Sequence, residues 1–194
     1  AEAVANKGNY RAVTDAKELA AFVDGIIAAG GEVALDTETD SLNTLTANLA
    51  GFSMSNKAGE GFYVPLMLTD ALFAETVAKK DALDHLARLF SAPNVTIIMH
   101  NGKFDIEVLW TNGLGKLVNP AHEDDIHFAA TIADTMIAAW LLEPDRSGKT
   151  AYALEYLSET HLHLKGTEYE EIVPKNGTFA DVPLESAAAY SSED

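Results

Sequence analysis

Apolar positions in the first third of the chain follow a helical pattern and then a strand pattern. Thr14 and Asp15 can cap a helix, and apolar residues recur at helical spacing after them. Gly30 and Gly31 end this run. Strands are predicted after it at residues 32–37, 47–55 and 60–66. The polar residues 56–59 separate the last two strands, which favours their pairing as a hairpin or meander.

The rest of the chain alternates between helical and strand patterns. Helices are predicted at residues 77–90, 101–110 and 135–142. A buried strand is predicted at 95–99, a polar acidic connector at 117–127 and a short strand at 131–133. Further helices are predicted near residues 150–160, near 167–172 and from Pro183 to the end. This order predicts one α/β domain over residues 1–194, with a central mixed five-stranded sheet flanked by helices.

The composition bounds the class of protein. With 194 residues, of which 47% are hydrophobic and 22% charged, the chain can bury a sizeable core, and disorder as its main state is excluded. It has no cysteine, which rules out disulfides, thiolate zinc sites and cysteine nucleophiles. No apolar run approaches the roughly 20 residues that span a bilayer, and no signal-peptide segment is evident. We therefore expect a soluble cytoplasmic protein with no membrane partner.

Acidic residues outnumber basic ones by a wide margin. The chain has 13 Lys and Arg against 30 Asp and Glu, which gives a formal charge of -17 at pH 7. Proteins that bind long stretches of duplex DNA usually carry the opposite charge, because they neutralise phosphates. Any nucleic-acid site on this chain must therefore be local.

Two carboxylates end the first predicted strand. Asp36 and Glu38 are two positions apart, so their side chains project from the same face of the sheet at its C-terminal edge. Taken alone, an Asp-x-Glu pair is more often an ordinary acidic strand end that leads into a turn. The other polar residues predicted at the same edge change this interpretation.

Two predicted helices add further polar side chains to this edge. Asn101 and Asp105 are four positions apart at the start of one helix, and Tyr190 and Asp194 repeat that spacing on the last helix. Four carboxylates, an amide and a phenol at one edge would be electrostatically costly unless divalent cations neutralised them. Because all of these ligands are oxygens, Mg²⁺ or Mn²⁺ is the expected kind of ion.

Three segments in combination resemble the motifs of a nuclease superfamily. They are residues 36–42 (DTETDSL), 100–105 (HNGKFD) and 190–194 (YSSED). They look like the three motifs of the DEDD 3′ to 5′ exonucleases, and the Tyr-x-x-x-Asp pattern is that of the tyrosine subclass. Residues 47–52, 133–136 and 169–172 look in particular like the proofreading domain of bacterial family A DNA polymerases, the DNA polymerase I family. The resemblance covers nearly the whole chain and implies a ribonuclease H-like fold.

The resemblance implies a catalytic role for each matching residue. Asp36 would bridge two divalent cations, and Glu38 and Asp194 would complete the tighter site. Asp105 would hold the second cation mainly through water. Two such cations can activate a water for in-line attack and stabilise the leaving 3′ oxygen. Tyr190 would orient the attacking water or donate to it; on the alternative interpretation it only packs as a helix aromatic.

The same resemblance implies residues that bind the substrate, namely Thr39, Leu42, His100, Asn101, Phe104 and Tyr169. Leu42 would be an apolar wedge against the terminal base, and Tyr169 would offer a stacking surface, which suits removal of any nucleotide. The family's second motif often has Gln before its Asn and Tyr before its Asp. This chain has His100 and Phe104 there, which changes the hydrogen bonds available to the terminal nucleotide.

These observations predict a metal-dependent 3′ to 5′ exonuclease that removes nucleotides from single-stranded or frayed DNA 3′ ends. Its partners would be the DNA 3′ end and the polymerase domain of the same parent chain, of which residues 1–194 would be a fragment. We expect a monomer, associated with the nucleoid in the cytoplasm. The alternatives are a stand-alone RNase D-like exonuclease that trims RNA 3′ ends and a catalytically inactive nuclease-fold scaffold. The presence of all four acids argues against the scaffold.

Two other groups of residues invite a chemical interpretation that we do not adopt. His122 and His127 flank acidic residues, and His161 and His163 alternate. Neither spacing is that of a structural zinc site, and no cysteine is available. Asp134 lies near the predicted sheet edge and is better interpreted as a helix N-cap than as a metal ligand.

Overall fold

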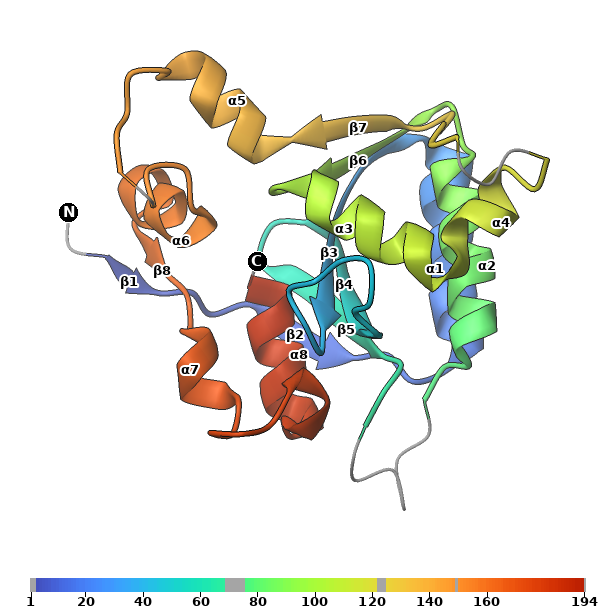
Figure 1. The fold of residues 1–194 in the computed structure, drawn as a ribbon, viewed down its shortest axis with the longest axis horizontal. Helices are drawn as coiled ribbons and strands as arrows, with labels where there is room; N and C mark the ends of the chain where they lie inside the picture. The colour runs from blue at the N-terminus through green and yellow to red at the C-terminus, as the bar shows by residue number, and fades with distance from the viewer. Residues whose placement is uncertain (1–2, 69–75, 122–124, 149, 194) are drawn as a thin grey trace.

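A six-stranded mixed sheet runs through the centre of the computed structural model, which describes residues 3–68, 76–121, 125–148 and 150–193 (Figure 1). The strands in sheet order are β2 (Asn9–Ala12), β5 (Glu60–Pro65), β4 (Leu49–Lys57), β3 (Gly31–Thr39), β6 (Val95–Met99) and β7 (Thr131–Asp134). β4 pairs antiparallel with β3 and β5, and the other neighbours are parallel. A separate two-stranded parallel sheet joins β1 (Val4–Ala5) to β8 (Leu164–Lys165).

The expected sheet was one strand short, because the sequence pattern missed β2. This strand has the sequence Asn-Tyr-Arg-Ala and alternates between exposed and half-buried residues. It lies at the edge of the sheet and pairs only with β5. An edge strand of polar residues has no apolar run to mark it, and β1 and β8 are too short to show a period.

The main helices lie where the sequence predicts them. The α-helices α1 to α8 span Ala16–Ala29, Lys79–Phe90, Gly102–Leu109, Gly115–Val118, Thr135–Leu142, Leu154–Leu157, Tyr169–Ile172 and Leu184–Glu193. Shorter helical turns occupy Trp110–Leu114, Ser158–Leu162 and Phe179–Asp181. Asp15 caps α1 by accepting the N–H of Lys17 at 2.8 Å, and Gly30 ends that helix at a φ of 67°. No helix within the described ranges is long and apolar enough to cross a membrane.

Two predicted segments differ in detail from the structure. The helix expected near residues 150–160 is a short α6 that continues into the turn at Ser158–Leu162. The first residues of the expected connector at 117–127 complete α4. Residues 122–124 of that connector and residue 194 of the last predicted helix lie outside the described residues.

Strand alternation sends side chains into two cores, one on each face of the sheet. On one face, α1 and α2 pack side by side over strand residues such as Phe52 and Ile97 (Figure 1). On the other face, α8 packs against β5, β2 and β4, and a smaller core forms around Tyr63 and Phe179. The smaller core places α8, which carries Tyr190, over the face onto which the acidic end of β3 projects.

Candidate active site

The end of β3 carries two of the predicted acidic residues on the face that α8 covers. Val33 and Leu35 point into the larger core. Successive strand residues point to opposite faces, so Asp36 and Glu38 project from the other face. Glu38 is buried, at 7% exposure, and Asp36 is half-buried. The strand therefore holds both carboxylates on one face without any contribution from a loop.

Two tyrosines lie near Glu38. Gly51 on β4 pairs with Glu38, and a Cβ at Gly51 would lie 2.2 Å from the hydroxyl oxygen of Tyr63, so only glycine leaves room for that ring. The Tyr63 hydroxyl donates to the carbonyl of Ala50 at 3.2 Å. Burial raises the pKa of Tyr63, and the charge of Glu38 raises it further. Burial and the same carboxylate also raise the pKa of Tyr169. Both phenols therefore stay protonated at neutral pH.

Asp105 reaches β3 at the edge that β6 leaves open. β6 pairs with β3 only as far as Ala34, after which the chain turns into α3. The backbone N–H of Thr37 donates to Asp105 Oδ1 at 3.0 Å, and the Thr37 hydroxyl donates to the same oxygen at 2.6 Å. A third carboxylate is thus bound to the residue between Asp36 and Glu38. Alternation alone puts Thr37 on the opposite face, and sequence reasoning did not identify it.

Burial controls the protonation of Asp105, which is only 2% exposed. Burial raises the pKa of its carboxyl from the usual 3.8 to about 6, and the hydrogen bonds from Thr37 act in the opposite direction. The negative charge of Asp134 adds a smaller upward contribution. Without a cation, this carboxyl therefore keeps its proton up to about pH 6.

Tyr190 joins the site from α8. Its ring packs against Tyr169 with centroids 6.2 Å apart and against Phe179 at 5.8 Å. It also lines a cavity of about 620 Å³ together with Asp36 and His100. Tyr190 therefore serves as a helix aromatic and also faces the cavity that holds a predicted catalytic carboxylate.

The carboxylates around Thr37 do not form a closed metal cage by themselves. Within the described ranges, no three His, Asp or Glu side chains converge closely enough to hold a metal ion. Asp36, Glu38 and Asp105 bring carboxylate oxygens to this region from two elements, β3 and α3. The fourth predicted ligand, Asp194, lies outside the described residues.

Leu42 and Tyr169 present apolar or aromatic surface to solvent, with 89% and 41% of their surface exposed. Leu42 lies in a loop that Asp40 and Asn48 close through side-chain hydrogen bonds of 2.7 and 2.8 Å. Thr39 is half-buried, and its hydroxyl donates to the carbonyl of Ser41 at 2.9 Å. The two exposed side chains are available to a nucleic acid, whereas the hydroxyl of Thr39 is already engaged within the chain.

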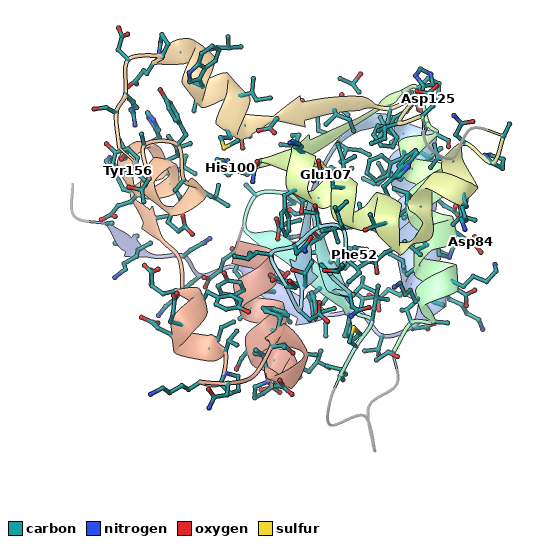
Figure 2. The ribbon with its side chains drawn as sticks, in the orientation of Figure 1. Phe52, Asp84, His100, Glu107, Asp125 and Tyr156 are labelled. Carbon is teal, nitrogen blue, oxygen red and sulfur yellow. The ribbon has the colours of Figure 1, made fainter. Side chains whose placement is uncertain are left out.

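The other three predicted substrate residues come from the β6–α3 junction. Asn101 is exposed and starts α3 in the left-handed conformation, at a φ of 57°. Phe104 packs half-buried against the larger core. His100 follows the end of β6 (Figure 2), and its Nδ1 lies 2.8 Å from the hydroxyl of Thr135 while Nε2 lies 2.9 Å from the carbonyl of Tyr152. Both ring nitrogens of His100 therefore bond within the chain.

The expectation that Asp134 caps a helix is confirmed. Its carboxylate accepts backbone N–H bonds at the start of α5, from Met136 at 2.9 Å and Ile137 at 3.2 Å. Of the histidines set aside above, His127, His161 and His163 are exposed, and His122 lies outside the described residues.

The mixed sheet carries acidic residues at the end of its central strand β3, as the resemblance to the DEDD 3′ to 5′ exonucleases leads us to expect. A family model described as "3′-5′ exonuclease" matches residues 10–194, and the chain belongs to this family. DNA polymerase I of Treponema pallidum (strain Nichols) is 35% identical over 219 residues, a match that covers 96% of this chain. The chain spans only about a fifth, 21%, of that relative's length.

Solved structures confirm the ribonuclease H-like fold. Escherichia coli RNase D, described as an exoribonuclease involved in structured RNA processing, superposes with a TM-score of 0.64 at 21% identity, over 96% of this chain and 41% of its own. Brucella melitensis NrnC with bound Mg²⁺ superposes with a TM-score of 0.52 at 20% identity, over 82% of this chain and 65% of its own. At these identities the likeness concerns the fold alone.

In metal-free buffer, we predict that Asp105→Asn is more stable than the wild type at pH 7, by up to about 3 kcal/mol. The folded protein keeps the Asp105 proton up to about pH 6, whereas the unfolded chain releases it near pH 3.8. Wild-type stability should therefore fall as the pH rises through that range. The amide has no proton to lose and still accepts from Thr37. Denaturant unfolding from about pH 3.5 to about pH 8 measures how the free energy of unfolding changes with pH in the wild type and in Asp105→Asn.

The exposed Asp125 supplies the matched control. Asp125→Asn makes the same chemical change at the surface, and its stability curve should follow that of the wild type. Equal slopes for the wild type and Asp105→Asn would contradict a buried carboxyl that holds its proton.

Proposed function

We propose that this chain is the metal-dependent 3′ to 5′ exonuclease unit of a DNA polymerase, and that it removes nucleotides from single-stranded or frayed DNA 3′ ends. The observation that carries the proposal is the bond between Thr37 and Asp105, which brings a third carboxylate to the strand position between Asp36 and Glu38. Membership of the 3′-5′ exonuclease family supports the reaction, and the similarity to DNA polymerase I supports the DNA substrate.

The proposed ligands of two divalent cations, Mg²⁺ or Mn²⁺, are Asp36, Glu38, Asp105 and Asp194. The donor set fits these ions, because they prefer carboxylate and water oxygens. Burial of Glu38 and Asp105 supports the same assignment, since buried negative charge needs a compensating positive charge. When bound, such cations supply an activated water and stabilise the leaving 3′ oxygen. The Mg²⁺ bound to the structural neighbour NrnC supports the choice of ion.

The chain's own residues would place the substrate and the attacking water. Tyr190 lines the same cavity as Asp36, and we assign to its hydroxyl the orientation of that water. Leu42 would wedge against the terminal base, and Tyr169 would stack on a base, because both side chains are exposed. Asn101 and Thr39 would lie near the terminal nucleotide. These contacts tolerate any base, as an enzyme that removes each nucleotide in turn requires.

The charge of the chain supports a role inside a larger protein. A formal charge of -17 offers little attraction for duplex DNA. The polymerase part of the parent chain would hold the duplex, and this unit would receive only a few unpaired nucleotides. We further propose that the parent chain acts as a monomer at the nucleoid in the cytoplasm.

Asp105→Asn should abolish cleavage of a single-stranded DNA in Mg²⁺ or Mn²⁺ while the protein stays folded. The amide keeps the bonds from Thr37 but removes the negative charge that the proposed second cation needs. Initial rates on a 5′-labelled oligonucleotide measure the loss, and Asp125→Asn should cleave like the wild type. Cleavage by Asp105→Asn at the wild-type rate would refute the assignment.

Single-stranded and mismatched 3′ ends should be shortened much faster than a paired end of the same sequence. Unpairing several nucleotides costs a few kcal/mol, and this acidic chain offers little to offset that cost. Initial rates on the three primers decide the matter, and equal rates would refute a proofreading mechanism. An RNA strand that is cleaved faster than its DNA equivalent would favour the RNase D-like alternative.

A further inference from the structure

One carboxylate at the sheet edge binds the start of two helices. Asp134 Oδ1 accepts the N–H groups of Met136 and Ile137 at the start of α5. Its Oδ2 accepts the N–H of Gly102, the first residue of α3, at 2.8 Å. The N–H of Asn101 also points at Oδ1, at 3.3 Å. Asp134 therefore acts as a cap for its own helix and for a helix that begins on the neighbouring strand.

α3 has no side-chain cap from its own sequence. The first N–H groups of a helix lack partners within it and need an acceptor. Asn101 occupies the N-cap position, but its side chain makes no capping bond and its backbone is left-handed, at φ 57° and ψ 40°. The acceptor that a local Ser, Thr or Asp would normally supply comes instead from Asp134, at the end of the adjacent strand β7.

The two strand–helix junctions are joined by a second set of bonds. The Thr135 hydroxyl lies 3.2 Å from the carbonyl of Met99 and 2.8 Å from Nδ1 of His100. The start of α3 is also tightly seated, since a Cβ at Gly102 would lie 2.8 Å from Cβ of Met99. The position of the first turn of α3 therefore depends on these bonds and on the close packing of Gly102 against Met99.

Asp105 lies in this first turn, three residues after Gly102. Its carboxylate must meet both the N–H and the hydroxyl of Thr37 at hydrogen-bond distance. A small displacement of the helix start would thus move Asp105 relative to β3, and Asn101 with it. Misplacing a reacting group by about 1 Å can cost about 100-fold in rate.

We infer that Asp134 is a positioning residue for the nuclease site: Oδ2 fixes the start of α3 so that Asp105 meets β3, while Oδ1 independently caps α5. The inference rests on the proposed function only for its effect on cleavage. The structural part stands on the bonds of Asp134 alone. No contact of Asp134 with substrate is required.

The substitution Asp134→Asn separates the two tasks. An asparagine caps a helix about as well as an aspartate, so its Oδ1 should keep the bonds to Met136 and Ile137. Its amide nitrogen then faces the N–H of Gly102. Both groups are donors, so no hydrogen bond can form between them. Turning the amide around would sacrifice two bonds at α5 to keep one at α3. The variant therefore loses the bond to the N–H of Gly102 and keeps the bonds to the start of α5.

Amide hydrogen exchange measured by nuclear magnetic resonance tests this first. In Asp134→Asn, exchange over residues 102–105 should quicken about tenfold, as loss of one hydrogen bond predicts, while α5 exchanges as in the wild type. The control is Asp15→Asn at the ordinary cap of α1, where Asp15 accepts the N–H of Lys17 in its own helix. It should leave the exchange of α3 unchanged.

Cleavage kinetics give the second readout. Asp134→Asn should lower kcat by about 10- to 100-fold with KM nearly unchanged, and Asp15→Asn should retain wild-type values. Unchanged exchange over residues 102–105, or equal quickening in α5, would overturn the inference whatever the activity. If exchange changes as expected but the wild type itself does not cleave DNA, the proposed function fails and the structural role of Asp134 is upheld.

Discussion

The early end of the pairing between β3 and β6 is the constraint on which the candidate site depends. β6 leaves β3 after Ala34, so the N–H of Thr37 must find an acceptor other than a strand carbonyl. Asp105 supplies that acceptor from α3. The unpaired N–H of Thr37 thereby fixes the position of the Asp105 carboxylate. Thr37 lies between Asp36 and Glu38, whose carboxylates project from the other face of the sheet. The place where β6 stops pairing with β3 therefore determines where the acidic residues gather.

Burying the carboxyl of Asp105 costs free energy whenever that group is charged and no cation is bound. Asp105 is buried, and burial raises its pKa to about 6 despite two hydrogen bonds from Thr37. The uncharged form of Asp105 avoids the cost of burying a charge in metal-free protein, and a bound cation would favour the charged form instead. The charge of Asp105 therefore lowers the stability of the metal-free protein and is needed for the proposed activity. A group that weakens the empty fold at neutral pH is the group that the proposed reaction needs.

Much of this could be predicted from the sequence, for identifiable reasons. The alternation of Asp36 and Glu38 follows from the strand period, and the Asp134 cap follows from residue type at a helix start. The edge strand β2 could not be found, because its short sequence, Asn-Tyr-Arg-Ala, shows no apolar period. Nor could the contact of Thr37 with Asp105, which are 68 positions apart, because it depends on where β6 stops pairing. The second task of Asp134 depends likewise on two junctions that only the fold brings together.

The direction of cleavage is the sharpest test of the proposal that this acidic end of the sheet removes nucleotides from the 3′ end of DNA. Two samples of one single-stranded DNA, labelled on the 3′-terminal or the 5′-terminal nucleotide, would be incubated with the protein in Mg²⁺. The 3′ label should leave as a mononucleotide in the first turnover, while the 5′-labelled strand should shorten one nucleotide at a time. Release of the 5′ label first, internal fragments, or no cleavage in either sample would contradict it.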